Sequence, residues 1–241
     1  MDHQKEERKE LLHDFLNKYD PAHNLSFNGV KFRPGAKRTV GFGIDTVTTQ
    51  YTKLRIHLAI DSGRSNSTGL KLFCPFDVDR TEFLEDYLTF GTMLFLYTNY
   101  GFHVRIAHIE LDGFAPGMLD RVRKGKSIKA GELIGDVGNA GLSFGAHAHT
   151  EIVSNENEFT ILDDILEEKY DRTIVHKNYT EDQVNSYLDG ASIPREEGWK
   201  MYEEEYTRRR LKIVNDYIGY RTDYFTGKER MFYSSMAVFG M

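Results

Sequence analysis

The sequence has a single cysteine, Cys74, among its 241 residues. One cysteine cannot form an intramolecular disulfide, and it cannot supply the several thiolates of a cysteine-based zinc site. We predict that Cys74 is a small buried residue rather than a nucleophile, because its neighbours are mostly apolar. Any metal site in this chain must therefore be built from histidine, aspartate and glutamate side chains.

The sequence also lacks a surplus of positive charge and any long apolar run. The formal net charge is −6, so we expect no nucleic-acid partner and no attraction to anionic surfaces. No apolar run is long enough to cross a bilayer, which predicts no membrane span. The N-terminal segment is densely charged, which argues against a secretory signal peptide. We therefore expect synthesis in the cytoplasm, with any exit by a route that needs no such signal.

The residue pattern changes twice along the chain, which predicts three regions. Residues 1–25 are expected to form a helical extension, with a helix over 4–19. Residues 26–154 contain short strand-like runs separated by glycine, asparagine and serine, which is typical of a compact antiparallel β-sandwich or barrel-like core. Residues 155–241 are expected to form a helical C-terminal extension. The predicted fold class is thus mainly β, or α+β with the extensions included.

Hydrophobic patterns predict the individual elements. The expected strands are 70–76, 93–98, 102–109, 133–137 and 148–153. The expected C-terminal helices are 161–170, 181–188 and a long helix from 193 to about 218, whose start is marked by Pro194. Residues 79–90 are interpreted as a short helix or an irregular insertion.

Two short segments carry most of the candidate chemistry. His147 and His149 are two residues apart, so a strand would present both imidazoles on one face. His57 and Asp61 are also an even number apart, and one strand would project both toward a common site. A lone pair of this kind is more often a solvated strand, whereas two pairs together favour a metal site. A further candidate, His108, lies on a third predicted strand.

Two imidazoles and one carboxylate are a chemically sensible set of zinc ligands. Zinc in hydrolases takes three protein ligands and keeps one position for water, whose pKa falls to about 7 on binding. One of the four paired residues would then remain to act as a general base or to stabilise an oxyanion. Spacing alone does not decide whether His147 or His149 binds the metal.

Four blocks follow one another along the chain: His57-x-x-x-Asp61, His108 within 106–109, the glycine-punctuated segment 125–141, and the segment 145–151. Their order and spacing resemble the lysostaphin-type zinc endopeptidases, the M23 peptidases, over roughly residues 38–154. The resemblance implies a compact, mainly antiparallel β fold. It also implies cleavage of the peptide cross-links of bacterial peptidoglycan.

The resemblance further implies a role for each site residue. The implied Zn²⁺ ligands are His57, Asp61 and His149. His147 and His108 correspond to a catalytic pair that orients or deprotonates water and stabilises the oxyanion. We prefer His108 to His103, because the two lie on opposite faces of one predicted strand and the surroundings of His108 match the family block.

The chain departs from the family pattern at several positions close to these blocks. Ala59 stands where the family usually has glycine, Ala148 where leucine is common, and Thr150 where an aromatic residue often follows. We expect these changes to leave the metal chemistry intact and to alter substrate fit.

Two other functions are compatible with parts of the pattern. The first is a non-hydrolytic structural or docking module, which the sizeable C-terminal extension would attach to a larger assembly. The second is a histidine phosphocarrier, which Asp61 at ligand spacing disfavours. For the peptidase, a bacteriophage product that is packaged in the virion or released at lysis would reconcile a substrate outside the membrane with the missing signal peptide.

Overall fold

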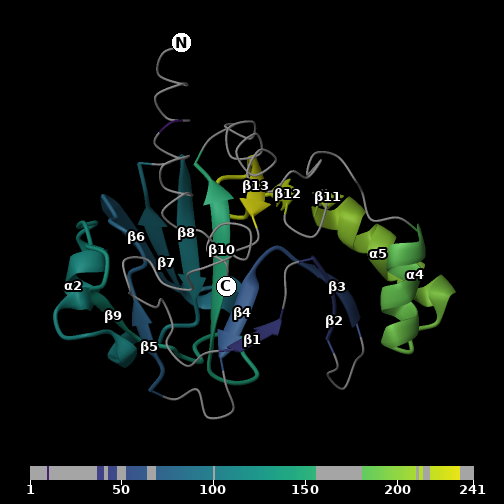
Figure 1. Ribbon diagram of the computed structural model, residues 1–241, viewed down its shortest axis with the longest axis horizontal. Coiled ribbons are helices and arrows are strands. Elements are labelled where there is room, and N and C mark those ends of the chain that lie inside the picture. Colours follow the sequence, from purple (N-terminus) through teal and green to yellow (C-terminus); the bar gives the residue numbers. More distant parts are fainter. Residues whose placement is uncertain are drawn as a thin grey trace.

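Strands make up most of the structure, a computed structural model that describes residues 10, 37–40, 43–47, 53–63, 69–99, 101–155, 181–209, 212–213 and 218–233. Nine strands join one sheet, and two further pairs form separate small sheets (Figure 1). All pairings among the described strands are antiparallel. The predicted mainly β, antiparallel fold is thus confirmed, although no pairing among these strands closes the sheet into a barrel.

The bounds of the elements agree well with most of the predicted ones. The strands are β1 (Lys37–Val40), β2 (Gly43–Val47), β3 (Lys53–His57), β4 (Ile60–Gly63), β5 (Lys71–Phe73), β6 (Arg80–Tyr87), β7 (Gly91–Tyr97), β8 (Phe102–Ala107), β9 (Leu133–Asp136), β10 (His147–Ser154), β11 (Lys212–Ile213), β12 (Ile218–Thr222) and β13 (Glu229–Tyr233). The helices are α2 (Met118–Arg123), α4 (Glu181–Gly190) and α5 (Arg195–Arg209), with short 3₁₀ turns η1 (Leu88–Phe90) and η2 (Leu111–Gly113). The five predicted strands correspond to β5, β7, β8, β9 and β10, and the predicted helix 181–188 corresponds to α4.

Strand β10 organises the sheet. It pairs with β8 along one edge, and along the other edge with β4 near its start and β13 near its end. Ala148 and Ile152 on β10 belong to the main apolar core, together with residues of β5, β7, β8 and β9. Because side chains alternate along a strand, His147, His149 and Glu151 lie on the opposite face of the strand from Ala148 and Ile152. This face is called here the polar face of β10.

Residues 79–90 contain a strand, so the predicted helix or irregular insertion is wrong. They form β6 and η1, and β6 pairs with β7 at one end of the sheet (Figure 1). The sequence does not reveal this strand because an edge strand keeps many charged, exposed side chains and only weak alternation. Pairing with the buried strand β7 selects the extended conformation.

The predicted long helix from 193 to about 218 is also too long. Helix α5 ends at Arg209, and the chain continues into β11 and β12. Strand β13 then pairs with β10, so the C-terminal segment adds strands to the central sheet. Helices α4 and α5 pack against Leu58, Val153 and Phe232 in a second apolar cluster. The boundary between 154 and 155 stays a prediction, although strand pairing crosses it.

The predicted helix 161–170 lies outside the described residues, and so does the predicted helix 4–19 except for residue 10. Within the described part of the chain, none of the helices has the length and apolar character needed to cross a membrane.

Cys74 is buried in the main core, as predicted. Its Sγ–H donates to the Phe76 carbonyl at 3.1 Å. Burial raises the pKa of the thiol to about 12, so little thiolate is available at neutral pH. The structure therefore gives Cys74 a packing role.

Candidate metal centre

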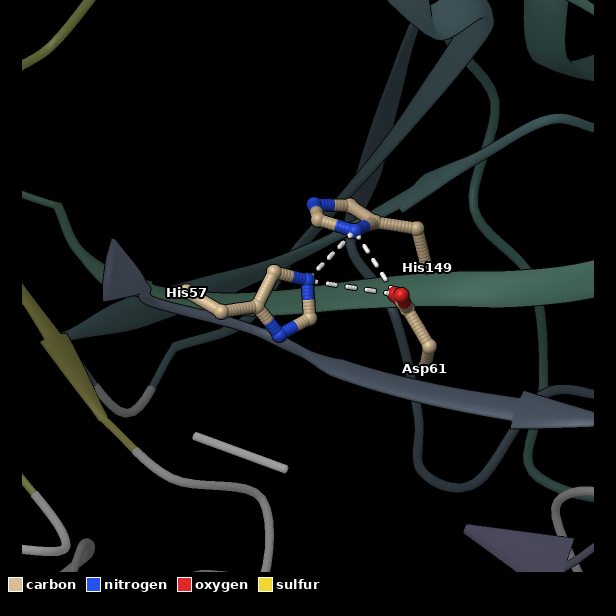
Figure 2. Close-up of side chains that lie close together, drawn as sticks. All are labelled: His57, Asp61 and His149. Carbon is tan, nitrogen blue, oxygen red and sulfur yellow. Dashed lines mark hydrogen bonds and ion pairs between the residues drawn. The ribbon is translucent and has the colours of Figure 1, made fainter. Parts of the chain in front are cut away.

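Three side chains converge at the polar face of β10 (Figure 2). His57 comes from the end of β3, Asp61 from β4 and His149 from β10, and all three are buried. The Nδ1 atom of His149 lies 2.8 Å from Oδ1 of Asp61 and 3.2 Å from Nε2 of His57. The same Oδ1 lies 3.3 Å from Nε2 of His57. Three ligand atoms thus face one another across a short gap.

The even spacing of His57 and Asp61 predicted that they share one strand, but they do not. Strand β3 ends at His57, β4 begins at Ile60, and the three residues between His57 and Asp61 are all buried. The break between the two strands means that alternation along a single strand does not relate His57 to Asp61. Cross-strand pairing of β4 with β10 sets Asp61 opposite His149. The predicted convergence is therefore observed, but its cause is strand pairing.

The atoms of this cluster fit a zinc ion. Tetrahedral zinc with bonds of about 2.0–2.1 Å to nitrogen and oxygen separates neighbouring ligand atoms by about 3.3 Å. The observed separations of 2.8, 3.2 and 3.3 Å are near that value. Two imidazoles and one carboxylate are also a ligand set that catalytic zinc sites use. Within the described residues, this cluster is the group of metal-ligating side chains that could hold an ion.

Hydrogen bonds and charge hold the three side chains together. Burial would raise the pKa of Asp61, but hydrogen bonds from His149 and His57 outweigh burial and hold that pKa well below its usual range. Burial would likewise lower the pKa of His149, whereas its hydrogen bonds to Asp61 and Glu151 outweigh burial and raise it to about 9. His149 therefore carries a proton on both ring nitrogens at neutral pH, and a metal ion must displace one of them.

Two further imidazoles, those of His147 and His108, lie beside the cluster. Nε2 of His147 is 3.7 Å from Oδ2 of Asp61, and the ring centroids of His108 and His147 are 4.7 Å apart. Nδ1 of His108 lies 2.7 Å from the carbonyl oxygen of Ala140, and Nδ1 of His147 lies 2.8 Å from that of Gly145. Because a carbonyl only accepts, each Nδ1 carries the hydrogen, and Nε2 is the acceptor of the neutral ring.

His108 reaches the site through an unusual backbone conformation. Strand β8 ends at Ala107, and His108 has a φ of 70°, in the left-handed region. The turn brings its ring to 5.9 Å from that of His149. Burial, and then the positive charge of His149, lower the pKa of His108 to about 4. Gly138 permits this arrangement, because a Cβ there would lie 2.3 Å from the carbonyl oxygen of His108.

His103 lies outside the cluster, although on the polar face rather than on the opposite one. Arg105 Nε–H donates to its Nε2 at 2.9 Å, and its Nδ1 lies 2.8 Å from Oδ1 of Asn155. On β8, His103 pairs with Val153, whereas the residue that pairs with His149 is Ala107, four positions further along the strand. The prediction that His108 and not His103 neighbours the metal cluster agrees with these positions. The reason given for it, opposite faces of one strand, is wrong.

The departures from the family pattern on β10 do not reach the polar face. Ala148 belongs to the main apolar core, and Thr150 alternates with His149 in the same way. Both are buried. Neither side chain is therefore placed to touch a substrate directly, and the expected effect of these two residues on substrate fit stays a prediction.

Three residues that adjoin the site were not predicted from the sequence. Glu151 could have been found, because the alternation of β10 places it on the same face as His149. Arg105 faces Glu151 across the β8–β10 pairing. Asp223, which binds Arg105, precedes β13 in a turn whose sequence gives no indication of that partner.

Comparison with known proteins returns solved structures, whereas no protein-family model and no curated protein matches the chain. The catalytic domain of the prophage-encoded M23 protein EnpA from Enterococcus faecalis is 20% identical, with a TM-score of 0.40 over 51% of this chain and 84% of that one. The catalytic domain of the antimicrobial peptidase lysostaphin from Staphylococcus simulans is 19% identical, with a TM-score of 0.40 over 52% and 85%. A chain from the complex of SpoIIIAH and SpoIIQ is 14% identical, with a TM-score of 0.39 over 49% and 85%.

Proposed function

We propose that this protein is a zinc metalloendopeptidase that hydrolyses peptide bonds in the stem peptides or cross-bridges of bacterial peptidoglycan. The observation that carries the proposal is the convergence of His57, Asp61 and His149 beside two further imidazoles, each hydrogen-bonded to a backbone carbonyl. The resemblance of the sequence blocks to M23 peptidases suggests the substrate. A zinc ion held by the three ligands would lower the pKa of a water molecule and polarise the scissile carbonyl.

His147 and His108 would handle the proton and the developing negative charge. Each ring keeps its Nδ1 hydrogen on a backbone carbonyl, so Nε2 can accept a proton from water. Once protonated, the same Nε2–H can donate to an oxyanion. We assign the first proton transfer to His147, which neighbours Asp61.

Digestion of purified cell walls tests this proposal. Walls with glycine-rich and with direct cross-links are incubated with the protein, with and without a zinc chelator, and new amino termini are counted. We expect release that the chelator and the His147→Ala variant abolish, and that Asp189→Asn, which removes an exposed ion pair with Arg195, leaves unchanged. Stoichiometric zinc without release from any wall type would reject the peptidase and favour the non-hydrolytic docking module.

The place of action is a separate proposal. We infer that the protein is a bacteriophage product, carried in the virion or released at lysis, with the C-terminal extension as its attachment to an assembly. The inferred substrate, which lies outside the cytoplasmic membrane, supports it. Mass spectrometry of purified particles should detect the chain, and its absence from particles would reject the virion form of this proposal.

A further inference from the structure

A buried guanidinium lies on the polar face beyond the metal cluster. Arg105 is 1% exposed. Its two terminal nitrogens donate to the two carboxylate oxygens of Asp223 at 2.6 and 2.9 Å. One of them also donates to Oε2 of Glu151 at 3.4 Å, and Nε donates to His103. A charge buried this deeply is stable only when it is paired and hydrogen-bonded, so these partners hold Arg105 in one position.

Glu151 joins this guanidinium to a candidate metal ligand. While its Oε2 accepts from Arg105, its Oε1 lies 3.4 Å from Nε2 of His149. An ionised carboxylate only accepts, so Nε2 of His149 carries a hydrogen. The other nitrogen of that ring, Nδ1, faces Asp61 and His57. Glu151 therefore selects which nitrogen of His149 points to the metal position.

Asp223 brings the C-terminal segment into this network. It is 0% exposed and lies in the turn between β12 and β13. The hydroxyl of Thr226 donates to it at 2.9 Å, and the Phe225 ring of the same turn lies 4.7 Å from the Arg105 guanidinium. Burial would raise the pKa of Asp223, but the hydrogen bonds and charge of Arg105 lower it. The turn thus supplies a fixed negative charge to Arg105.

We propose that Glu151 is a positioning residue for His149, and that the Asp223–Arg105 pair keeps Glu151 in place. The β12–β13 hairpin then helps to set the orientation of a metal ligand. If Asp223 lost its charge, Glu151 would be the carboxylate that remains bound to Arg105 among the described residues. The guanidinium would then attract Glu151 away from His149. This inference rests on the proposed function only in taking His149 as a metal ligand.

Zinc affinity of the full-length chain tests the proposal without any activity measurement. Competition with a chromophoric chelator is applied to the wild type, Glu151→Ala, Glu151→Gln and Asp223→Asn. Loss of a hydrogen-bond partner of a metal ligand lowers metal affinity by about 10- to 100-fold. We expect a fall in this range for Glu151→Ala, a smaller fall for Asp223→Asn, and partial recovery in Glu151→Gln, whose amide oxygen can still accept from His149.

Val104→Ala is the matched control. Val104 precedes Arg105 on β8 but faces the main apolar core, so its truncation weakens the fold without touching the network. Its zinc affinity should equal that of the wild type. The absorption spectrum of the cobalt-substituted protein should change in Glu151→Ala and Asp223→Asn but not in Val104→Ala, because it reports ligand geometry.

The outcomes separate this inference from the function on which it rests. A wild type that binds no zinc would reject the metal centre itself. A wild type that binds zinc, with equal affinity in Glu151→Ala and Asp223→Asn, would overturn only the positioning network, as would an equal loss in Val104→Ala. If Asp223→Asn does not fold, Thr226→Ala replaces it. That variant removes one hydrogen bond to Asp223, and unchanged affinity there would reject the role of the hairpin.

Discussion

Acid should destabilise the metal-free protein through His103. This side chain is buried, and its Nε2 accepts a hydrogen bond from Arg105. Protonation would place a hydrogen on Nε2 that faces the N–H of a permanent cation, so the hydrogen bond would be lost and the two charges would repel each other. Burial, and then the charge of Arg105, accordingly lower the pKa of His103 to about 3 from its ordinary 6.5.

The sign and size of the effect follow from these two pKa values. Because the unfolded chain takes up the proton first as the pH falls, the neutral imidazole stabilises the fold fully only above pH 6.5. That stability is lost progressively between pH 6.5 and about 3. From pH 7 to pH 5 the loss in the free energy of unfolding amounts to about 2 kcal/mol.

Urea denaturation in the presence of a chelator measures this loss. His103→Gln is the informative variant, because the glutamine amide can accept a hydrogen bond from Arg105 and does not titrate. We expect its stability to fall by about 2 kcal/mol less than that of the wild type between pH 7 and pH 5. If the two pH profiles were parallel, with a constant difference in stability that reflects packing alone, the reasoning would be refuted.

Three further predictions concern the site and the core. Gly138→Ala should lower peptidase activity and leave zinc affinity nearly unchanged, because its Cβ would displace His108; loss of zinc in a chelator competition would contradict this. Ala148→Leu should lower the free energy of unfolding by about 1–3 kcal/mol, because the residue is buried in the main core; urea denaturation measures this, and a changed bond preference without destabilisation would contradict its placement. Zinc binding at pH 7 should release about one proton, because the pKa of His149 is raised to about 9. Calorimetry in buffers of different ionisation enthalpy counts that proton, and no release would contradict the assigned charge.

Local geometry made part of the site predictable from sequence. The two-residue spacing of His147 and His149 determines a shared face as soon as the segment is a strand, and β10 is one. In the structure, the carboxylate of Asp61 lies close to the rings of both His147 and His149. The order of the sequence blocks, through their family resemblance, predicted that His57 and Asp61 belong with His149, which spacing alone could only suggest.

The rest depends on contacts between distant segments, which local patterns do not encode. Asp223 lies 118 positions from Arg105, and their ion pair exists only because the hairpin packs on the polar face. Strand β6 is extended because β7 pairs with it, despite its exposed, charged surface. His108 reaches the site through a left-handed residue at the end of β8, where regular alternation would have pointed it toward the opposite face.

Zinc content after reconstitution tests the central claim most directly. The wild type, His149→Ala and His147→Ala are stripped of metal, incubated with zinc, desalted and analysed for bound metal. The two variants remove neighbouring imidazoles from the same face of one strand, so each serves as the control for the other. We predict about one zinc per chain in the wild type and in His147→Ala, and loss of that zinc in His149→Ala. Full zinc retention in His149→Ala, or its loss only in His147→Ala, would contradict the proposed metal centre.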